Sequence, residues 1–234
     1  NIYKISLFIV VLIIMVNPCI SLARATVNDF PNELLSELQD GYKFRMSILS
    51  YGTMNEPADS TQNPDNDFLK INDYSEILEL RPDFKLSFRD FFFSIKPRAE
   101  LSFEQFRTGT QKGEKNHDYN IFINEYLFQY QATDKWFLSF GREFLQWGPS
   151  FLFAPSNPFF ADNGKSRPDQ EGDGKEFAKV LWIPDISWTC SIIVNTGNGR
   201  SSDAGFNKTY ALKTDYSGDS AYASIIFSHL EGDN

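Results

Sequence analysis

Charged or polar side chains recur at every second position from Glu79 to Arg89, with Ser87 the one uncharged member, and this spacing is the strongest indication of chemistry in the chain. Alternation with period two places such residues on one face of a β-strand, opposite a face formed by the residues between them. A row of acids and bases of this kind has no nucleophile, but it can attract or exclude charged solutes in water. The chemistry to expect is therefore electrostatic selection of solutes.

The residues between these positions are apolar, so this stretch combines an apolar face with a polar one. A strand in a soluble sheet averages about 5 to 6 residues, whereas a strand that crosses a bilayer needs about 9 to 11. The alternating stretch in this chain is long enough for a strand that crosses a bilayer. It predicts a strand with lipid on one side and water on the other, and its apolar residues are Leu78, Leu80, Pro82, Phe84, Leu86 and Phe88.

A second charged strand follows the short turn Arg89-Asp90, and opposite charges on two neighbouring strands can pair. A later strand adds a third group of charges. In a pore such residues set the selectivity for ions and solutes. The alternative interpretation is an ion-pair network that only supports the wall of a barrel. The candidate pore-lining residues are Glu79, Arg81, Asp83, Lys85, Arg89, Arg98, Glu100, Glu104, Arg142 and Glu143.

Signatures of catalysis are weak in this sequence. The two histidines, His117 and His229, are both expected at loop ends, and Ser228 next to His229 would point to the opposite face of a strand. No phosphate-binding loop, nucleophile elbow or metal-spaced histidine pair is present. We therefore expect neither enzymatic activity nor a cofactor.

An acidic segment imitates the first half of a calcium-binding EF-hand loop, with Asp169, Glu171 and Asp173 before Gly174. Its twelfth position is Val180, where a bidentate glutamate would be needed. We therefore expect a solvated acidic loop and no metal site.

The first 25 residues resemble an export address. Lys4 precedes an apolar run at 5–16, and Ala23-Arg24-Ala25 offers small residues at a cleavage site, which predicts a cleaved signal peptide over 1–25. The alternative is an uncleaved N-terminal anchor. No later apolar run reaches the roughly 20 residues of a transmembrane helix, so any membrane residence must be by strands.

The remaining chain has one cysteine, Cys190, and carries 20 basic against 31 acidic residues. A single cysteine excludes an internal disulfide. The acidic balance argues against nucleic acid as a partner, because binding to phosphates needs clustered Lys and Arg.

The patterning predicts a short helix at 30–38, ended by Gly41, and nine strands. Short turns at 89–90, 132–135, 184–185 and 217–219 alternate with long polar connections at 52–67, 108–117, 147–175 and 196–205. Outer-membrane barrels sort their connections in this way, with short turns on one rim and long loops on the other. The strands are expected at 42–51, 72–89, 91–107, 119–130, 136–146, 176–183, 188–195, 207–216 and 221–230.

The expected fold class is all-β, an antiparallel up-and-down transmembrane β-barrel. A signal peptide (1–25) and a short periplasmic segment (26–41) would precede the barrel domain (42–234). Bacterial barrels normally close with an even number of strands. Nine strands therefore predict the N-terminal part of a larger barrel, and 14 to 18 strands would need roughly 350 to 420 residues.

Aromatic residues near the expected strand ends would form the interfacial girdles of such a barrel. The alternative is that they are ordinary core residues. The residues in question are Tyr130, Trp136, Trp147, Trp182 and Trp188.

The long connection at 147–175 combines prolines, which stiffen its backbone, with phenylalanines that would be costly to leave in water. We expect it to narrow the passage by folding into the lumen. A loop packed over the rim or at a subunit contact would hide the same apolar mass. The residues proposed to form the constriction are Trp147, Gly148, Pro149, Pro155, Asn157 and Pro158.

One segment resembles porin-like outer-membrane barrels of Gram-negative bacteria. A Gly141-Arg142 strand runs into a Trp147-Gly148 pair, then a Pro155-Ser156-Asn157-Pro158 loop and a strand from Glu176 to Trp182. The resemblance covers about 141–185 in residues and about 76–230 in architecture. It implies a porin or an uncharacterised relative of the barrels that export sugars and polymers, and it does not identify a substrate.

The expected function is a porin-like channel in the bacterial outer membrane that passes small hydrophilic solutes. Its expected partners are outer-membrane lipid, lipopolysaccharide and those solutes, with a homo-oligomer as an option and no nucleic acid. Two alternatives stay open: a structural, adhesive or plugged barrel, and a secreted β-sandwich that binds carbohydrate through exposed aromatics.

Overall fold

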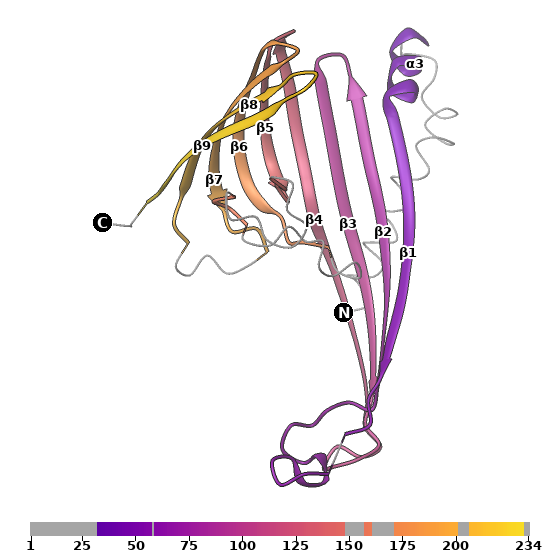
Figure 1. Ribbon diagram of the computed structural model, residues 1–234. Coiled ribbons are helices and arrows are strands. Elements are labelled where there is room, and N and C mark those ends of the chain that lie inside the picture. Colours follow the sequence, from indigo (N-terminus) through magenta and orange to yellow (C-terminus); the bar gives the residue numbers. More distant parts are fainter. Residues whose placement is uncertain (1–31, 58, 148–156, 161–170, 201–205, 232–234) are drawn as a thin grey trace. The chain divides into compact units, whose positions relative to one another are not determined.

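A computed structural model describes residues 32–57, 59–147, 157–160, 171–200 and 206–231 (Figure 1). The predicted signal peptide at 1–25 lies outside these residues. Three of the six residues expected in the constriction, Gly148, Pro149 and Pro155, also lie outside them.

The nine predicted strands are confirmed, and they form one antiparallel sheet in which each strand neighbours the next along the chain (Figure 1). In the described residues the sheet is not closed into a barrel, and β1 and β9 are its edges. The strands are β1 (Tyr42–Met54), β2 (Tyr74–Phe88), β3 (Phe91–Gln105), β4 (Lys115–Thr133), β5 (Trp136–Glu143), β6 (Lys175–Asp185), β7 (Trp188–Gly197), β8 (Thr209–Ser217) and β9 (Tyr222–Leu230).

The alternation of short and long connections is also confirmed. Short turns occupy 89–90, 134–135, 186–187 and 218–221, and long connections occupy 55–73, 106–114, 144–174 and 198–208. Several predicted strand boundaries were wrong; β1, for example, extends to Met54 and not only to Tyr51, and two further errors concern residues assigned to connections. Pro184 and Asp185 belong to β6 and not to the turn after it, and His117 belongs to β4, a strand of 19 residues. Both errors arise because proline and polar side chains are also tolerated where one face of a strand is exposed.

The predicted short helix is α3 (Asn32–Gly41), which lies two to three residues later than expected. It passes directly into β1. Glycine is required at this junction, because a Cβ atom on Gly41 would lie 1.8 Å from the carbonyl oxygen of Ser87. Among the described residues, no helix has the length and apolar character needed to cross a membrane.

The described chain divides into two compact units. One contains residues 45–83 and 97–122, which are parts of β1 to β4 with the connections 55–73 and 106–114. The short 3-10 helix η2 (Pro64–Asn66) lies in the first of these connections. The other unit contains 26–44, 84–96 and 123–234, and therefore holds α3 and strands β5 to β9.

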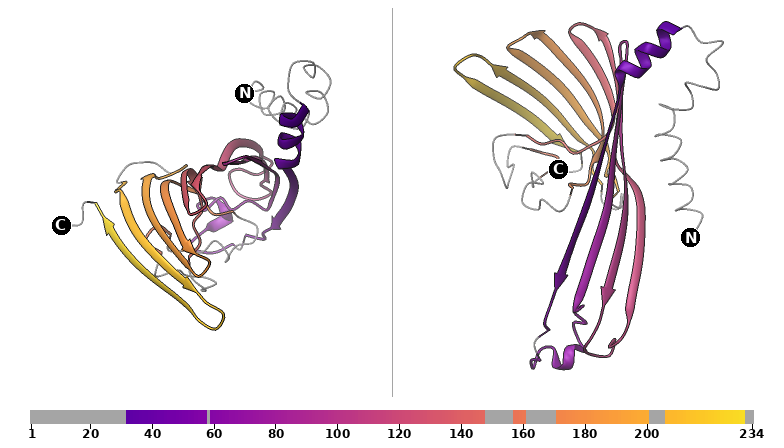
Figure 2. Two further views of the ribbon diagram at one scale, coloured as in Figure 1. Left: turned by 90° about the horizontal axis from the view of Figure 1, so that it is seen from above. Right: turned by 90° about the vertical axis from the view of Figure 1, so that its right-hand side faces the viewer.

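In the second unit, β5 to β9 are paired in an antiparallel register and lie side by side in Figures 1 and 2. Phe140 opposes Ala178 and Gly141 opposes Phe177. The register admits no side chain at Gly141, because a Cβ atom there would lie 2.1 Å from the carbonyl oxygen of Tyr126 on β4.

The two faces of β5 to β8 differ in what covers them. Buried residues Phe177, Ile193 and Ala211 lie on one face, and residues of the 144–174 connection pack against them. We call this the loop face. The opposite face, which we call the exposed face, carries large apolar side chains open to the surroundings: Trp136, Leu138, Phe140, Trp182, Trp188, Ile192, Tyr210 and Leu212.

Candidate functional site

The connection after β5 is joined to the loop face by an aromatic cluster. Phe159 lies between Trp147 and Phe177, with ring centroids 5.4 Å and 4.9 Å away, and both contacts are edge-on. Phe177 is fully buried, with 0 % of its surface exposed. Edge-to-face aromatic pairs at these distances contribute about 0.5 to 1.5 kcal/mol beyond the burial of their area. The described part of this connection is therefore held on the face of the sheet and does not hang free.

Asn157 fixes the backbone that presents the two phenylalanines. Its amide nitrogen donates to the carbonyl oxygen of Leu145 at 2.7 Å, and its amide oxygen accepts from the backbone N–H groups of Phe159 at 3.0 Å and Phe160 at 3.3 Å. The side chain is buried, so these bonds satisfy groups that would otherwise lack partners. Of the predicted constriction residues, the structure thus brings Trp147 to the loop face, Asn157 holds the adjoining backbone, and Pro158 is half-buried between Asn157 and Phe159 in the sequence.

Two lysines of the loop face contact the same segment. Lys175 donates from Nζ to the carbonyl oxygen of Phe159 at 3.0 Å, and its Nζ lies 5.3 Å from the ring centre of Phe160. Lys213 lies 5.6 Å from the ring of Trp147 and also pairs with Asp215. A cation within about 6 Å of an aromatic face is attracted by the ring quadrupole. The aromatic cluster is therefore bordered by cations from β6 and β8.

Two further ion pairs join neighbouring strands in the second unit. Lys179 on β6 lies 2.6 Å from the carboxylate of Glu143 on β5, and Lys96 on β3 lies 2.8 Å from Glu125 on β4. All four side chains are largely shielded from solvent. Partly buried pairs of this kind brace neighbouring strands, and they leave little net charge along the surface that they occupy.

The expected pairing of charges between the second and third strands is confirmed in the first unit. Asp83 on β2 accepts from the guanidinium of Arg98 on β3 at 3.0 Å and from that of Arg45 on β1 at 2.6 Å. Arg98 is only 1 % exposed and also donates to the carbonyl oxygens of Pro82 and Pro97. Asp83 therefore links three strands, and Arg98 is held by an ionic and two neutral acceptors.

The other charges predicted to line a pore have varied positions. Glu79 and Arg81 pair with each other along β2 at 2.6 Å. Glu104 accepts from the side chain of Asn72, and Arg89 lies in the short turn, 3.5 Å from Glu37 of α3. Lys85 is exposed on β2, and Glu100 is half-buried on β3. Most of these candidates are thus already engaged by protein groups.

Arg142 and Glu143 cannot both line one surface. They are adjacent in β5, so their side chains point to opposite faces. Arg142 lies on the exposed face, where it opposes Glu176 in the register and pairs with it at 2.6 Å. Glu143 lies on the other face, where Lys179 reaches it. Grouping Arg142 and Glu143 as residues that line one pore did not take into account that side chains alternate between the two faces of a strand.

The predicted aromatic girdle has a mixed outcome. Trp136, Trp182 and Trp188 lie on the exposed face, close to the short turns, and the first two stack at 5.6 Å. Tyr130 is half-buried in β4 and contacts Phe91. Trp147 was wrongly included, because it is buried in the cluster on the loop face. Its neighbours in sequence do not reveal this, since the contact comes from distant strands.

Sequence reasoning missed several residues of the site. Phe177, Ile193 and Ala211 were read only as parts of strands, and Lys179 and Lys213 were not singled out. The signal was present in β6, where Phe177 and Lys179 share a face while Ala178 and Val180 occupy the other. Because both faces of this strand carry apolar residues, a pattern of period two could not say which one is covered.

The acidic segment before β6 is engaged by the protein itself. Glu171 accepts from the amide of Asn124 at 3.1 Å, and Asp173 pairs with Arg200 at 3.1 Å. Asp169 lies outside the described residues. The described part of the chain contains no group of His, Cys, Asp and Glu side chains arranged to hold a metal ion.

The contacts on the loop face can hold the aromatic segment around Phe159 in one position, beside the ion pair of Glu143 and Lys179. The exposed face presents apolar side chains that an apolar environment could cover. Comparison with family models, with curated proteins and with solved structures finds no match to this chain.

Proposed function

We propose that this chain forms part of a porin-like β-barrel in the outer membrane of a Gram-negative bacterium and passes small hydrophilic solutes along its loop face. The observation that carries the proposal is the contrast between the two faces of β5 to β8. One presents Leu138, Phe140, Ile192 and other large apolar residues to the surroundings, with the ion pair of Arg142 and Glu176 near the end of β5. The other carries the ion pair of Glu143 and Lys179 and the packed connection. Lipid on one side and water on the other would satisfy both faces.

Strand lengths and aromatic positions support a membrane location. Strands β5 to β9 contain 8 to 11 residues, close to the 9 to 11 that a tilted strand needs to cross the hydrocarbon region. Trp136, Trp182 and Trp188 gather near the short turns on the exposed face, as expected for residues at one membrane interface. The sorting of short and long connections adds support, because transmembrane barrels have the same asymmetry.

The packed connection would narrow the passage. Trp147 and Phe159 are anchored on the loop face by Phe177, and Asn157 holds the backbone between them. The resemblance of 141–185 to porin-like barrels supports the same role. Because charges such as Glu143 and Lys179 are paired, we propose that they brace the wall and that size selection by the aromatic segment dominates.

The proposal includes export by the 1–25 signal, contact with outer-membrane lipid and lipopolysaccharide, and no covalent chemistry. Homo-oligomerisation is compatible with it.

The full chain, purified in detergent and added to planar lipid bilayers, tests the proposal by single-channel conductance. We expect discrete conductance steps, and a Trp147→Ala/Phe159→Ala variant should conduct more because the segment loses its aromatic anchor. Phe140→Ala on the exposed face is the matched control and should leave the step size unchanged. A protein that inserts but passes no current would contradict the channel.

A plugged or structural barrel is the second candidate. The burial of Phe159 and the cations on either side of the aromatic cluster favour it, because they would hold the connection closed. It predicts that the wild-type chain inserts without current and that only the Trp147→Ala/Phe159→Ala variant conducts. The secreted β-sandwich has less support, since a sandwich needs two packed sheets and the described residues form one.

A further inference from the structure

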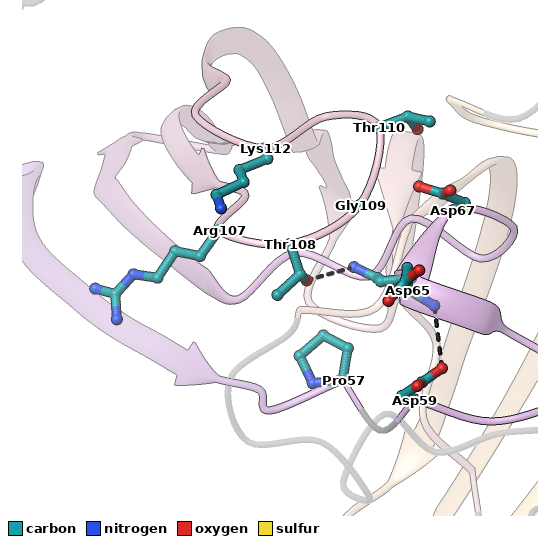
Figure 3. A pocket seen from close by; sticks show the side chains of 10 residues that line it. Pro57, Asp59, Asp65, Asp67, Arg107, Thr108, Gly109, Thr110 and Lys112 are labelled. Atoms are coloured by element: carbon teal, nitrogen blue, oxygen red, sulfur yellow. Dashed lines mark hydrogen bonds between the residues drawn. The ribbon is translucent and has the colours of Figure 1, made fainter.

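A pocket of about 520 Å³ lies in the first unit, between the connection 55–73 and the connection 106–114. Asp59, Asp65 and Asp67 line it from the first connection, and Arg107, Thr108 and Lys112 line it from the second (Figure 3). Its size is within the range of about 300 to 1,000 Å³ that small-molecule sites occupy. None of these residues takes part in the channel proposed above.

Buried asparagines give the first wall of this pocket a fixed shape. Asn66 donates to the carbonyl oxygen of Ile71 at 2.8 Å and to the hydroxyl of Thr108 at 3.2 Å, and it accepts from the N–H of Ile71 at 2.9 Å. The side-chain oxygen of Asn63 accepts from the N–H groups of Phe68 and Leu69. Both asparagines are nearly inaccessible to solvent. The pocket is therefore organised before any ligand arrives.

The second connection approaches the first closely. Gly109 has a φ angle of 75°, and a Cβ atom on it would lie 2.8 Å from the carbonyl oxygen of Asn66. Asp65 and Asn66 themselves have φ angles of 51° and 61°, in the left-handed region that is costly for residues other than glycine. The hydrogen bonds of Asn66 hold this conformation, which places the side chain of Asp65 at the pocket.

Charge is segregated across the pocket. Carboxylates come from 59–67 and cations from 107–112, and in Figure 3 Arg107 and Lys112 lie to one side of Asp65 and Asp67. The ion pairs within the described part of the chain do not include any that join these two groups. Opposite charges kept apart at the walls of one pocket suit a ligand that carries both signs at its two ends.

We propose that this pocket binds short zwitterionic peptides, with the terminal ammonium at Asp65 and Asp67 and the terminal carboxylate at Arg107 and Lys112. Charge-assisted hydrogen bonds to both ends are the strong contacts available to such a ligand, and capture of chain termini is a recurring mode of peptide recognition. A peptide of two to four residues suits the volume better than a single amino acid.

The test uses the full chain in detergent micelles and isothermal titration calorimetry with trialanine. We expect saturable binding that weakens at least tenfold in Asp65→Asn/Asp67→Asn and in Arg107→Gln/Lys112→Gln. The control variant Asp134→Asn/Lys135→Gln, in the turn between β4 and β5, removes one charge of each sign and should bind like the wild type. Circular dichroism of each variant is the control for retention of the sheet.

Capped peptides assign each end. N-acetyltrialanine lacks the ammonium, so it should bind weakly and lose nothing further in Asp65→Asn/Asp67→Asn. Trialanine amide should behave in the same way toward Arg107→Gln/Lys112→Gln. The proposal would be overturned if trialanine showed no saturable binding, if either capped peptide bound as tightly as trialanine, or if a neutral trisaccharide did so. Because binding in micelles needs no pore, this outcome is independent of the conductance measurement.

Discussion

The ring of Phe159 lies edge-on against the ring of Phe177, with 4.9 Å between centroids and 72° between planes. One residue belongs to the long connection after β5, and the other belongs to β6. This contact, together with Trp147, Ile193 and Ala211, ties a segment of irregular backbone to the face of a regular sheet.

A double-mutant cycle measures the coupling of these two rings. Phe177→Ala removes a fully buried side chain and should lower the free energy of unfolding by about 3 to 5 kcal/mol. We expect Phe159→Ala to cost less in the presence of Phe177→Ala than alone, with a coupling of about 0.5 to 1.5 kcal/mol. Unfolding by guanidinium in detergent measures both, and additive effects would show that the rings do not interact.

Asn157 is expected to control the backbone of the aromatic segment. Asn157→Ala removes the acceptor for the N–H groups of Phe159 and Phe160, so both amides should exchange hydrogen faster. Asn157→Asp keeps that acceptor and loses only the donor to Leu145, so it should preserve protection of the two amides better than the alanine variant. Amide hydrogen exchange measured by mass spectrometry compares them. Equal exchange in the two variants would contradict this role.

Loss of the Asp83 carboxylate should lower the stability of the protein far more than loss of the Arg45 guanidinium, because the partner left behind by Asp83→Asn, Arg98, is buried. Asp83→Asn leaves the buried guanidinium of Arg98 without its ionic partner, which typically lowers stability by about 3 to 5 kcal/mol. Arg45→Gln removes a side chain that is 77 % exposed, and exposed pairs contribute about 0 to 1 kcal/mol. Denaturant unfolding of the two variants should therefore separate them clearly. If the two variants lost similar free energies of unfolding, the stabilising partner of Asp83 would be Arg45 and not Arg98.

Gly141 should tolerate no side chain. Gly141→Ala would place a Cβ atom 2.1 Å from the carbonyl oxygen of Tyr126 and force β4 and β5 apart. Overpacking of this kind costs about 1 to 3 kcal/mol. Ser139→Ala, two residues earlier on the same face of β5, is the control and should change stability by less than about 0.5 kcal/mol. Thermal unfolding with a circular dichroism signal compares the two, and a neutral Gly141→Ala would refute the close approach.

Arginine substitutions on the two faces of β5 test the orientation of the sheet in lipid. Leu138 lies on the exposed face and Ser139 on the opposite one. Leu138→Arg should impair insertion into liposomes by about 2 to 4 kcal/mol if that face meets hydrocarbon, whereas Ser139→Arg should insert nearly normally. Partition of the purified chain between liposomes and the aqueous phase is the measurement. Equal insertion of both variants would contradict a lipid-facing role for Leu138.

Much of the strand architecture could be predicted from the sequence because it depends on local rules. Alternation of side chains reports a strand with two different faces, and clusters of Asp, Asn, Gly and Pro report connections. All nine strands and the order of short and long connections followed from these rules. That charges on the second and third strands can pair also followed, because a two-residue turn fixes which strands are neighbours, whereas the choice of Asp83 as the partner of Arg98 was decided by the structure.

The tertiary structure decided which residues meet across long sequence distances. No local pattern in the sequence predicts the aromatic cluster, in which Trp147 and Phe159 are buried against Phe177, Ile193 and Ala211. Alternation of side chains shows that a strand has two different faces, but it does not show which segment covers either face. The alternation along β5 already separates Arg142 from Glu143, but the partner that each residue meets, such as Glu176 opposite Arg142, required the register, which comes from hydrogen bonds between strands. The pocket beside Asp65 required two connections distant in sequence to approach each other at Gly109. The sequence by itself thus determined the strands and their alternation, and the packing of irregular segments determined where the candidate sites lie.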